Sequence, residues 1–213
     1  VAVRNTPDAA AAYVLAGDSY FADELLRVDA TRIQWRLPLE SMGPGLRSVY
    51  FLGVDAGGAG LRLALTEGSS RIVRVTADGR VAWWREDAGD GLGVLAWLPA
   101  PLLVRNPEDS AATFEALDPA TGETRFVTSS PVQFRYLQLL PSSRDDGGWR
   151  LSGPGNGFVN SVLDLAPDGR VLVRWRSDDS RDQAMVELAD GSLLVRRDVD
   201  PFQSSDQEAT WSL

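Results

Sequence analysis

Two segments of this 213-residue chain have nearly the same sequence. VTADGRVAWWRE begins at Val75, and LAPDGRVLVRWR begins at Leu165, 90 residues further on. Halfway between them, EALDPATGETRF carries Gly122 at the expected position, and a weaker copy, LLRVDATRIQWRLPL, begins at Leu25. An internal repeat constrains the fold strongly, because every copy must form the same unit and bury its apolar face against a neighbouring copy.

Each copy of the repeat predicts a β-hairpin. An alternating apolar run leads into a tight turn, usually Asp-Gly or Thr-Gly, and a second alternating run ends in an aromatic residue. Alternation with a period of two indicates half-buried strands, and the glycine supplies the positive φ that such turns need. The closing aromatic residues are expected to pack between neighbouring sheets. They are Trp35, Trp83 with Trp84, Phe126 and Trp175.

The period of the repeat predicts the architecture. A spacing of about 45 residues that holds several short strands is typical of one blade of a β-propeller, so the expected fold class is all-β. The expected four-stranded blades cover about residues 10–40, 46–87, 92–130, 132–178 and 182–213. The last blade is about one strand short, and Val1–Asn5 is predicted to complete it, which gives five blades in a single domain of residues 1–213. A fragment of a larger propeller is the alternative.

The segment before the first copy allows two interpretations. Thr6–Gly17 begins Thr-Pro-Asp and continues into an alanine run, a pattern typical of the start of a short helix. The residues from Tyr13 onward also fit the first hairpin of the first blade. We expect the hairpin.

The turn of the third copy resembles a known repeat. LDPATGETRF (Leu117–Phe126), and more weakly LLRVDATRIQWRLPL (Leu25–Leu39), are similar to the repeats of quinoprotein-like (PQQ-type) β-propellers, which read roughly ALD-x-x-TG-x-x-x-W. Members of that family include quinone-dependent dehydrogenases, a lipoprotein scaffold of outer-membrane protein assembly, and sensor or binding domains. The dehydrogenases use eight blades and hold their quinone beside a calcium and a disulfide. The resemblance therefore implies the fold and does not imply the dehydrogenase activity.

Three residue types are absent, and their absence excludes several kinds of chemistry. The chain has no Cys, no His and no Lys, so all 21 of its basic residues are Arg. Disulfides, thiol nucleophiles, Ser-His-Asp triads, the usual zinc sites, Schiff bases and Walker-type phosphate loops are therefore excluded. The formal net charge of −9 disfavours nucleic acid and anionic membranes as partners.

The distribution of apolar residues and the first residues of the chain bear on where the protein works. No apolar run is long enough to cross a bilayer, so membrane insertion is not expected. The chain opens VAVRNTPDAA, without Met and without a signal peptide, which fits both a processed mature chain and a piece of something longer. We expect an exported bacterial protein, either periplasmic, at the cell surface or extracellular.

Three of the seven tryptophans are candidates for binding a ligand. Exposed Trp rings can stack on a sugar or contact a partner protein. Trp84 follows Trp83 on one expected strand, so the two side chains should face opposite sides of the sheet. Trp84, Trp97 and Trp149 are predicted to be exposed.

A calcium site is a second candidate. The segment SDDSRDQ holds Asp178, Asp179 and Asp182 between the last two expected blades, and hard oxygen ligands at such short spacing could bind calcium. It matches no EF-hand or nonapeptide calcium pattern, and a solvated loop is the alternative. No other cofactor is expected.

Two glycine-rich stretches have the composition of an anion site. GVDAGGAG (Gly53–Gly60) and SGPGNGFVN (Ser152–Asn160) expose backbone amides that could approach an anion. Neither has the strand–turn–helix context of a phosphate loop, and turn chemistry between strands is the simpler explanation.

The functional prediction follows from the repeats that the sequence contains and from its lack of a catalytic motif. No catalytic residue stands out, because most acidic residues lie in turns. We therefore expect a non-enzymatic β-propeller that acts as a scaffold or sensor and recognises a partner protein or small ligand through its loops. The alternatives are a carbohydrate-active propeller, either a lectin or a glycosidase with two axial carboxylates, and a calcium-dependent hydrolase.

Overall fold

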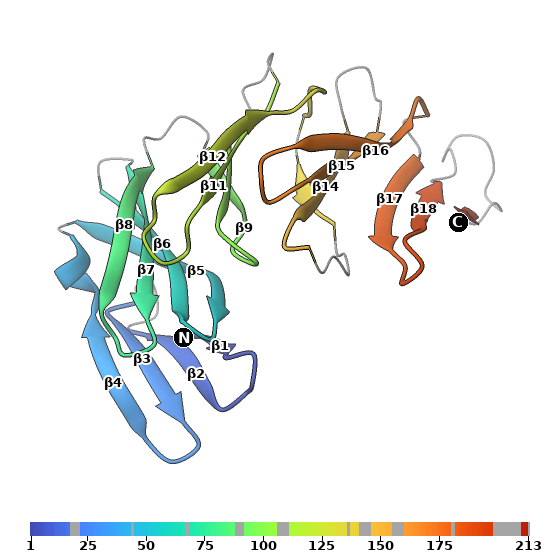
Figure 1. Ribbon diagram of the computed structural model, residues 1–213. Helices are drawn as coiled ribbons and strands as arrows, with labels where there is room; N and C mark the ends of the chain where they lie inside the picture. Colours follow the sequence, from blue (N-terminus) through green and yellow to red (C-terminus); the bar gives the residue numbers. More distant parts are fainter. Residues whose placement is uncertain are drawn as a thin grey trace, which may run out of the picture. The chain divides into compact units, whose positions relative to one another are not determined.

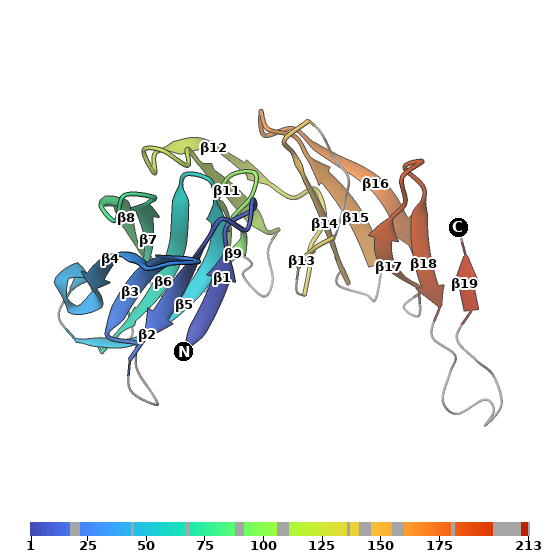
Figure 2. The ribbon, with the colours of Figure 1, turned by 90° about the horizontal axis from the view of Figure 1, so that it is seen from below.

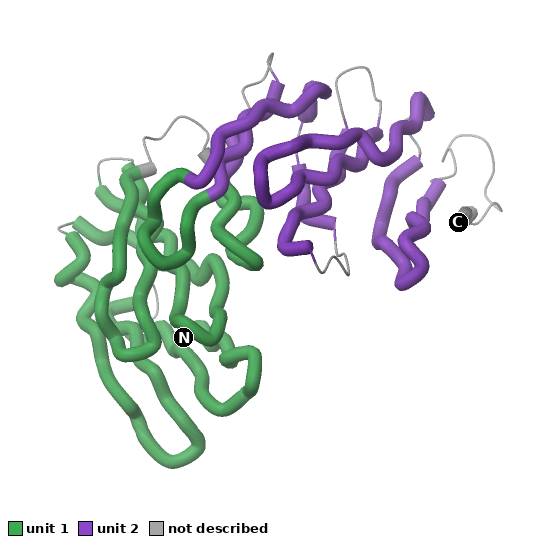
Figure 3. The backbone as a smooth tube through the Cα atoms, in the orientation of Figure 1, with its two compact units in different colours: residues 1–102, 117–124 green, residues 103–116, 125–213 purple. Residues whose placement is uncertain are grey.

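The computed structural model describes residues 1–17, 22–43, 45–66, 69–87, 92–105, 111–135, 137–140, 146–154, 160–179, 182–197 and 210–212. The chain divides into two compact units (Figure 3). Unit 1 consists of Val1–Leu102 and Leu117–Thr124, and unit 2 consists of Leu103–Ala116 and Arg125–Leu213. The prediction of a single domain stays a prediction.

Strands make up nearly all of the regular structure. They are β1 (Ala2–Asn5), β2 (Ala11–Ala16), β3 (Glu24–Asp29), β4 (Ile33–Pro38), β5 (Leu46–Asp55), β6 (Gly58–Leu65), β7 (Ser70–Thr76), β8 (Val81–Asp87), β9 (Leu92–Ala96), β10 (Leu102–Arg105), β11 (Thr113–Leu117), β12 (Thr124–Ser129), β13 (Gln138–Leu139), β14 (Trp149–Pro154), β15 (Asn160–Leu165), β16 (Val171–Ser177), β17 (Asp182–Glu187), β18 (Leu193–Arg197) and β19 (Thr210–Ser212). A short 3-10 helix, η1 (Leu39–Met42), follows β4.

The described strands form five sheets, each built from strands that are consecutive in the chain (Figure 1, Figure 2). Four sheets are four-stranded, with the orders β1-β2-β3-β4, β5-β6-β7-β8, β9-β10-β11-β12 and β13-β14-β15-β16, and the fifth is β17-β18-β19. The pairings in the first and second sheets are antiparallel, as are those in the fourth and fifth. The prediction of an all-β chain with four-stranded sheets is confirmed.

One part of the predicted strand assignment is wrong. The segment Val1–Asn5 does not complete the last sheet, because Ala2 to Asn5 pair with Leu15 to Ala12 in the first sheet. The turn between the two strands explains this local pairing: the Ala11 N–H donates to Thr6 Oγ1 (3.1 Å), and the Thr6 hydroxyl donates to Asp8 (2.6 Å). A short hairpin has a much lower loop-closure entropy cost than a pairing across the whole chain.

The same turn decides between the two interpretations of Thr6–Gly17. The Thr-Pro-Asp sequence forms a tight turn, in which Asp8 also accepts a hydrogen bond from the Ala10 N–H (3.1 Å). Strand β2 then begins at Ala11 and pairs with β3. The hairpin prediction is confirmed, because side-chain groups that can cap a helix can equally close a turn.

The core of unit 1 lies between its first two sheets. Large apolar side chains of β2 and β3 meet those of β6 and β7, and all are almost completely buried. They are Tyr13, Leu15, Leu25, Leu61, Leu63, Val73 and Val75. Each such side chain contributes about 2 kcal/mol of hydrophobic stabilisation relative to full exposure, so this contact is a major source of stability for unit 1.

An aromatic residue on the fourth strand of one sheet packs on the hairpin turn of the next sheet. A Cβ atom on Gly79 would lie 2.8 Å from the Trp35 ring, and the Trp35 indole N–H donates to the Ala77 carbonyl (2.9 Å). Trp83 has the same relation to Gly122, at 2.6 Å, and donates to the Pro119 carbonyl (3.1 Å). The predicted packing of these tryptophans between sheets is confirmed.

Unit 2 contains the third contact of this kind and a buried ion network. Phe126 packs on the turn at Gly169. Arg150, which is 3% exposed, donates to both oxygens of Asp164 (2.6 and 2.8 Å) and also contacts the buried carboxylate of Glu187. These charges join β14, β15 and β17, and removing one of them would leave its partner buried with an uncompensated charge.

Candidate functional site

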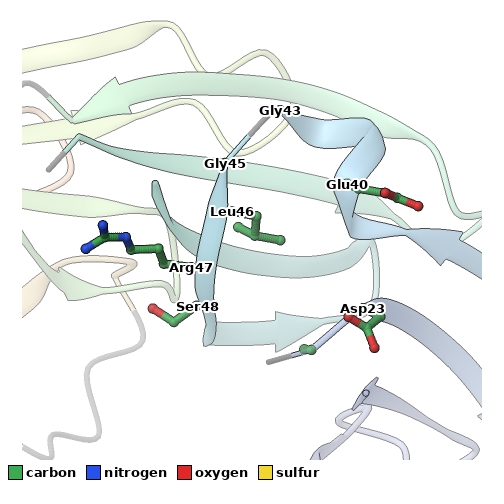
Figure 4. Close-up of a pocket in the computed structure, with 8 residues that line it drawn as sticks. Asp23, Glu40, Gly43, Gly45, Leu46, Arg47 and Ser48 are labelled. Carbon is green, nitrogen blue, oxygen red and sulfur yellow. The ribbon is translucent and has the colours of Figure 1, made fainter. Parts of the chain in front are cut away.

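A cavity of about 490 Å³ lies in unit 1, beside the segment that links the first sheet to the second (Figure 4). This cavity is called the groove. Its lining residues are Ala22, Asp23, Glu40, Gly43, Gly45, Leu46, Arg47 and Ser48. Its volume falls within the range of roughly 300–1,000 Å³ that is typical of small-ligand pockets.

The sequence of the linking segment explains the shape of the groove. Strand β4 ends at Pro38, and the buried Leu39 then anchors η1 to the core of unit 1. The Leu39 N–H donates to the carbonyl of Asp23 (2.8 Å), which brings the neighbouring Glu40 close to Asp23. The Thr66 N–H donates to the Gly45 carbonyl (2.8 Å) and holds the other end of the segment. Both edges of the groove are therefore fixed by backbone hydrogen bonds.

Charged groups line the groove without partners inside the protein. Among the described residues, none makes a side-chain hydrogen bond or an ion pair with Asp23, Glu40 or Arg47. Figure 4 shows the two carboxylates on one side and Arg47 with Ser48 on the other. The groove thus offers acceptors for a cation at one end and a donor for an anion or carbonyl at the other.

One buried ion pair of unit 1 is used within the protein. Arg74 is 6% exposed and forms a bidentate ion pair with Asp55, with nitrogen–oxygen distances of 2.7 and 2.5 Å. Burial raises the pKa of Asp55, but the hydrogen bonds and positive charge of Arg74 outweigh it, so the net pKa of Asp55 is lowered. This pair supports the fold, whereas the charges of the groove are available to a ligand.

Trp84 lies close to the groove and is exposed as predicted. Its ring is 53% exposed, and the Arg71 guanidinium lies 4.6 Å from the ring centroid. Arg71 also donates to the Met42 carbonyl (3.0 Å) and to Glu86 (3.2 Å). A Cβ atom on Gly43, which lines the groove, would lie 2.6 Å from Arg71. Arg71 therefore connects the linking segment to an exposed aromatic ring.

The other two predicted tryptophans are not at the surface. Trp97 is 5% exposed and stacks on Trp83 with ring centroids 6.0 Å apart. Its ring lies against Gly53 and Gly60, where a Cβ atom would come within 2.6 and 2.3 Å of the indole. The prediction that Trp97 is exposed is wrong, because the glycine-rich stretch Gly53–Gly60 makes room for its ring.

Trp149 is also buried, in unit 2. It is 2% exposed and packs edge-on against Phe126, with ring centroids 6.2 Å apart. The prediction that it is exposed is wrong, because it begins β14 and faces the aromatic residue that packs on the next sheet. The second glycine-rich stretch, SGPGNGFVN, includes residues 155–159, which lie outside the described residues.

The three predicted calcium ligands are used separately. Asp182 receives two hydrogen bonds from Arg197 (2.6 and 2.9 Å) and one from Ser177 (2.8 Å), and the pKa of Asp182 is lowered chiefly by Arg197. Asp178 is exposed and lies 3.7 Å from Arg176, and the Asp179 N–H donates to Ser177 (3.1 Å). No group of three potential metal ligands occurs anywhere in the described part of the chain.

Sequence reasoning missed the groove. Asp23, Glu40 and Arg47 belong to no motif, and they lie in the stretches between the repeats. The useful signal was the segment LPLESMGPG, which breaks the alternating pattern with two prolines and two glycines next to an acidic residue. Such a segment indicates an irregular connection, and binding residues are often found on connections held by a rigid scaffold.

Comparisons with known proteins identify the fold. No family model and no curated protein sequence matches the chain. Among solved structures, the WD40 domain of SCAP from fission yeast aligns with 93% of this chain and 51% of its own, at 11% identity and a TM-score of 0.51. A structure of BBS1N in complex with ARL6DN aligns at 13% identity and a TM-score of 0.47, over 92% of this chain and 61% of its own.

BamB from Moraxella catarrhalis aligns at 17% identity and a TM-score of 0.39, over 88% of this chain and 59% of its own. The chain therefore spans about half to three fifths of the length of these structures. The chain has a β-propeller fold, as predicted. Its described part contains no helix with the length and apolar character needed to cross a membrane.

Proposed function

We propose that this β-propeller is a non-enzymatic binding module that holds a segment of a partner protein in the groove. The observation that carries the proposal is the set of charged side chains, Asp23, Glu40 and Arg47, that line the groove and have no side-chain partner among the residues that the structure describes. Ionised groups placed on a rigid scaffold and left free within the protein can exchange water for a complementary ligand.

The ring of Trp84 supports the same proposal. Arg71 holds one exposed aromatic ring in place next to the linking segment that forms the groove. Rigid aromatic side chains are frequent energetic centres of protein interfaces, because little conformational entropy is lost when they are covered. A partner segment that fills the groove and continues over Trp84 would use both features.

Two predictions from the sequence are part of the proposal: membership of the quinoprotein-like propellers and export from a bacterial cell. Placement among the quinoprotein-like propellers is supported by the turn at Asp118, which accepts hydrogen bonds from the N–H groups of Ala120 (2.8 Å) and Thr121 (3.0 Å). Gly122 completes this turn with a φ of +73°. Export from a bacterial cell is the second of these proposals, and it rests on the sequence.

A peptide library tests the proposal directly. The purified chain is panned against a phage-displayed library of random peptides, beside a variant carrying Asp23→Asn, Glu40→Gln and Arg47→Ala. The expected result is a family of peptides that bind the unmodified chain and lose binding to the variant. Glu123→Gln is the matched control, because Glu123 is an exposed acid that does not line the groove.

The carbohydrate alternative is tested in parallel on a glycan array. Trp84 is the feature that a sugar would use, since exposed rings stack on sugar faces. Binding to glycans without any selected peptide would overturn the protein-binding proposal. Selected peptides that bind the groove variant as well as the unmodified chain would also contradict it.

A further inference from the structure

If the proposed function holds, the distribution of charge along the groove indicates which charges the partner segment carries. Asp23 and Glu40 lie on one side of the groove, and a hydrogen bond from the Leu39 N–H to the Asp23 carbonyl (2.8 Å) joins their two segments. Arg47 lies on the opposite side. The groove therefore has an acidic end and a basic end.

We infer that the groove binds an extended segment in which a basic residue lies near an acidic one. The Arg or Lys of the partner is held between Asp23 and Glu40, and its Asp or Glu pairs with Arg47. A segment with two charges of the same sign would place like charges together at one end of the groove. Like-charge contacts at an interface are strongly unfavourable.

Three observations support this occupant over the others. The first is charge complementarity, since a ligand with only one sign of charge would leave one end of the groove unsatisfied. The second is size: a cavity of about 490 Å³ accommodates more than one side chain, so it fits a short stretch of polypeptide. The third is that the described residues contain no group of three side chains that could hold a metal ion, so the structure does not favour a bound metal at this end.

The neighbouring surface is consistent with an extended segment. Gly43 lines the groove, and Arg71 lies against it and under the exposed ring of Trp84. A segment that leaves the groove past Gly43 would pass Arg71 on its way to this ring. Gly43 has a φ of +153°, a conformation that L-residues rarely adopt, and a side chain there would collide with Arg71.

The experiment uses synthetic peptides of one fixed Gly/Ser background. The test set carries Arg and Glu separated by zero, one or two glycines, in both orders. The comparison peptides carry Arg with Arg, Glu with Glu, or Gly at both positions. Binding is measured by fluorescence anisotropy of labelled peptides at low and at high salt. The Arg/Glu peptides should bind at least about tenfold more tightly than the Arg/Arg, Glu/Glu and Gly/Gly peptides, and salt should weaken this binding.

Variants of the groove then assign the charges. Glu40→Gln should weaken the preferred peptide about tenfold, the usual effect of removing a charged hydrogen-bond partner, whereas Glu123→Gln should not change it. Arg47→Glu should abolish the preference for the Arg/Glu peptide and create a preference for the Arg/Arg peptide. This exchange of specificity requires a folded variant, so it cannot arise from simple loss of structure.

The outcomes separate this inference from the proposed function. If the library yields peptides that need the groove but carry no paired opposite charges, the charge inference is wrong and the binding function stands. If the Arg/Glu peptides bind no more tightly than the Arg/Arg or Glu/Glu peptides, or if Arg47→Glu leaves the preference unchanged, the inference is also wrong. If no peptide of any kind requires the groove, the proposed function itself fails.

Discussion

The packing of Trp83 on Gly122 predicts a large and specific cost for Gly122→Ala. Gly122 has a φ of +73°, and Gly147 in unit 2 has nearly the same φ, +74°. Alanine at either position adopts the same unfavourable left-handed conformation, which costs about 1–2 kcal/mol. The two sites differ in what a Cβ atom would meet, so Gly147→Ala measures the backbone cost alone.

The surroundings of the two glycines set the difference. At Gly147 the nearest atom to an added Cβ belongs to Pro167, 3.8 Å away, which is an ordinary contact. At Gly122 the Cβ would lie 2.6 Å from the ring of Trp83. That ring cannot easily shift, because its N–H donates to the Pro119 carbonyl (3.1 Å) and its other side stacks on Trp97. Overpacking adds about 1–3 kcal/mol, which gives about 2–5 kcal/mol in total for Gly122→Ala.

Urea unfolding followed by far-ultraviolet circular dichroism measures both costs. The free energy of unfolding should fall by about 1–2 kcal/mol in Gly147→Ala and clearly further in Gly122→Ala. In a Trp83→Leu background, the smaller side chain relieves the collision, so Gly122→Ala should cost no more than Gly147→Ala. Equal costs for the two glycines, or a cost at Gly122 that does not depend on Trp83, would refute the close approach.

Three further predictions concern charges and the exposed ring. Asp55→Asn leaves Arg74 buried without a charged partner, so the free energy of unfolding should fall by about 3 kcal/mol in urea, and an unchanged midpoint would contradict the pairing. Asp182→Asn should destabilise the protein at neutral pH. Arg197 lowers the folded-state pKa of Asp182 below its ordinary 3.8, so this stabilisation is present above that value and lost as pH falls through the folded pKa. The loss of stability in Asp182→Asn, measured by urea midpoints, should therefore become smaller in acid. A loss that does not change with pH would exclude this dependence of stability on the charge of Asp182. Trp84→Ala should leave the melting temperature almost unchanged, because the ring is 53% exposed, yet weaken peptides selected on the unmodified chain; unchanged peptide binding would remove Trp84 from the site.

Features of the fold that depend on residues close together in the sequence could be predicted from it. The turns at Gly79, Gly122 and Gly169 have the positive φ that the repeats required. The aromatic residues Trp35 and Trp83 pack on the turns of the following sheets. Both features follow from the repeat itself, because alternation, turn residues and closing aromatics recur together in each copy.

Burial of Trp97 could not be predicted from its local sequence. Its ring fills the space left by Gly53 and Gly60, which lie about 40 residues earlier and on different strands. A tryptophan in a loop-like stretch such as AWLPA gives no sign of such a distant partner. The prediction for Val1–Asn5 failed for a different reason. It assigned this segment to the last sheet by counting strands and ignored the local hairpin that Ala2–Asn5 form with β2.

The candidate site could not be predicted because it arises outside the repeat. Asp23 directly precedes β3, and Glu40 and Arg47 lie near the two ends of an irregular connection. A backbone hydrogen bond from Leu39 to Asp23 joins the first two of these segments. By contrast, two of the three tryptophans predicted to bind a ligand, Trp97 and Trp149, are buried in the core. In a repeat fold the positions that recur are those that build the core, so binding residues are found where the copies differ.

The use of arginine throughout the chain supports the same distinction between structure and binding. Three guanidinium groups reach backbone carbonyls of other segments: Arg27 donates to Ala77 (2.9 Å), Arg71 to Met42 (3.0 Å) and Arg174 to Gly191 (2.8 Å). The planar guanidinium can satisfy a carbonyl while it also pairs with a carboxylate or stacks on a ring, which an ammonium group does less well. Arg47 has no such acceptor among the described residues. Elsewhere in this fold arginine joins one segment to another. At the groove, Arg47 has no partner among the described residues, and a partner segment with a complementary charge would pair with it.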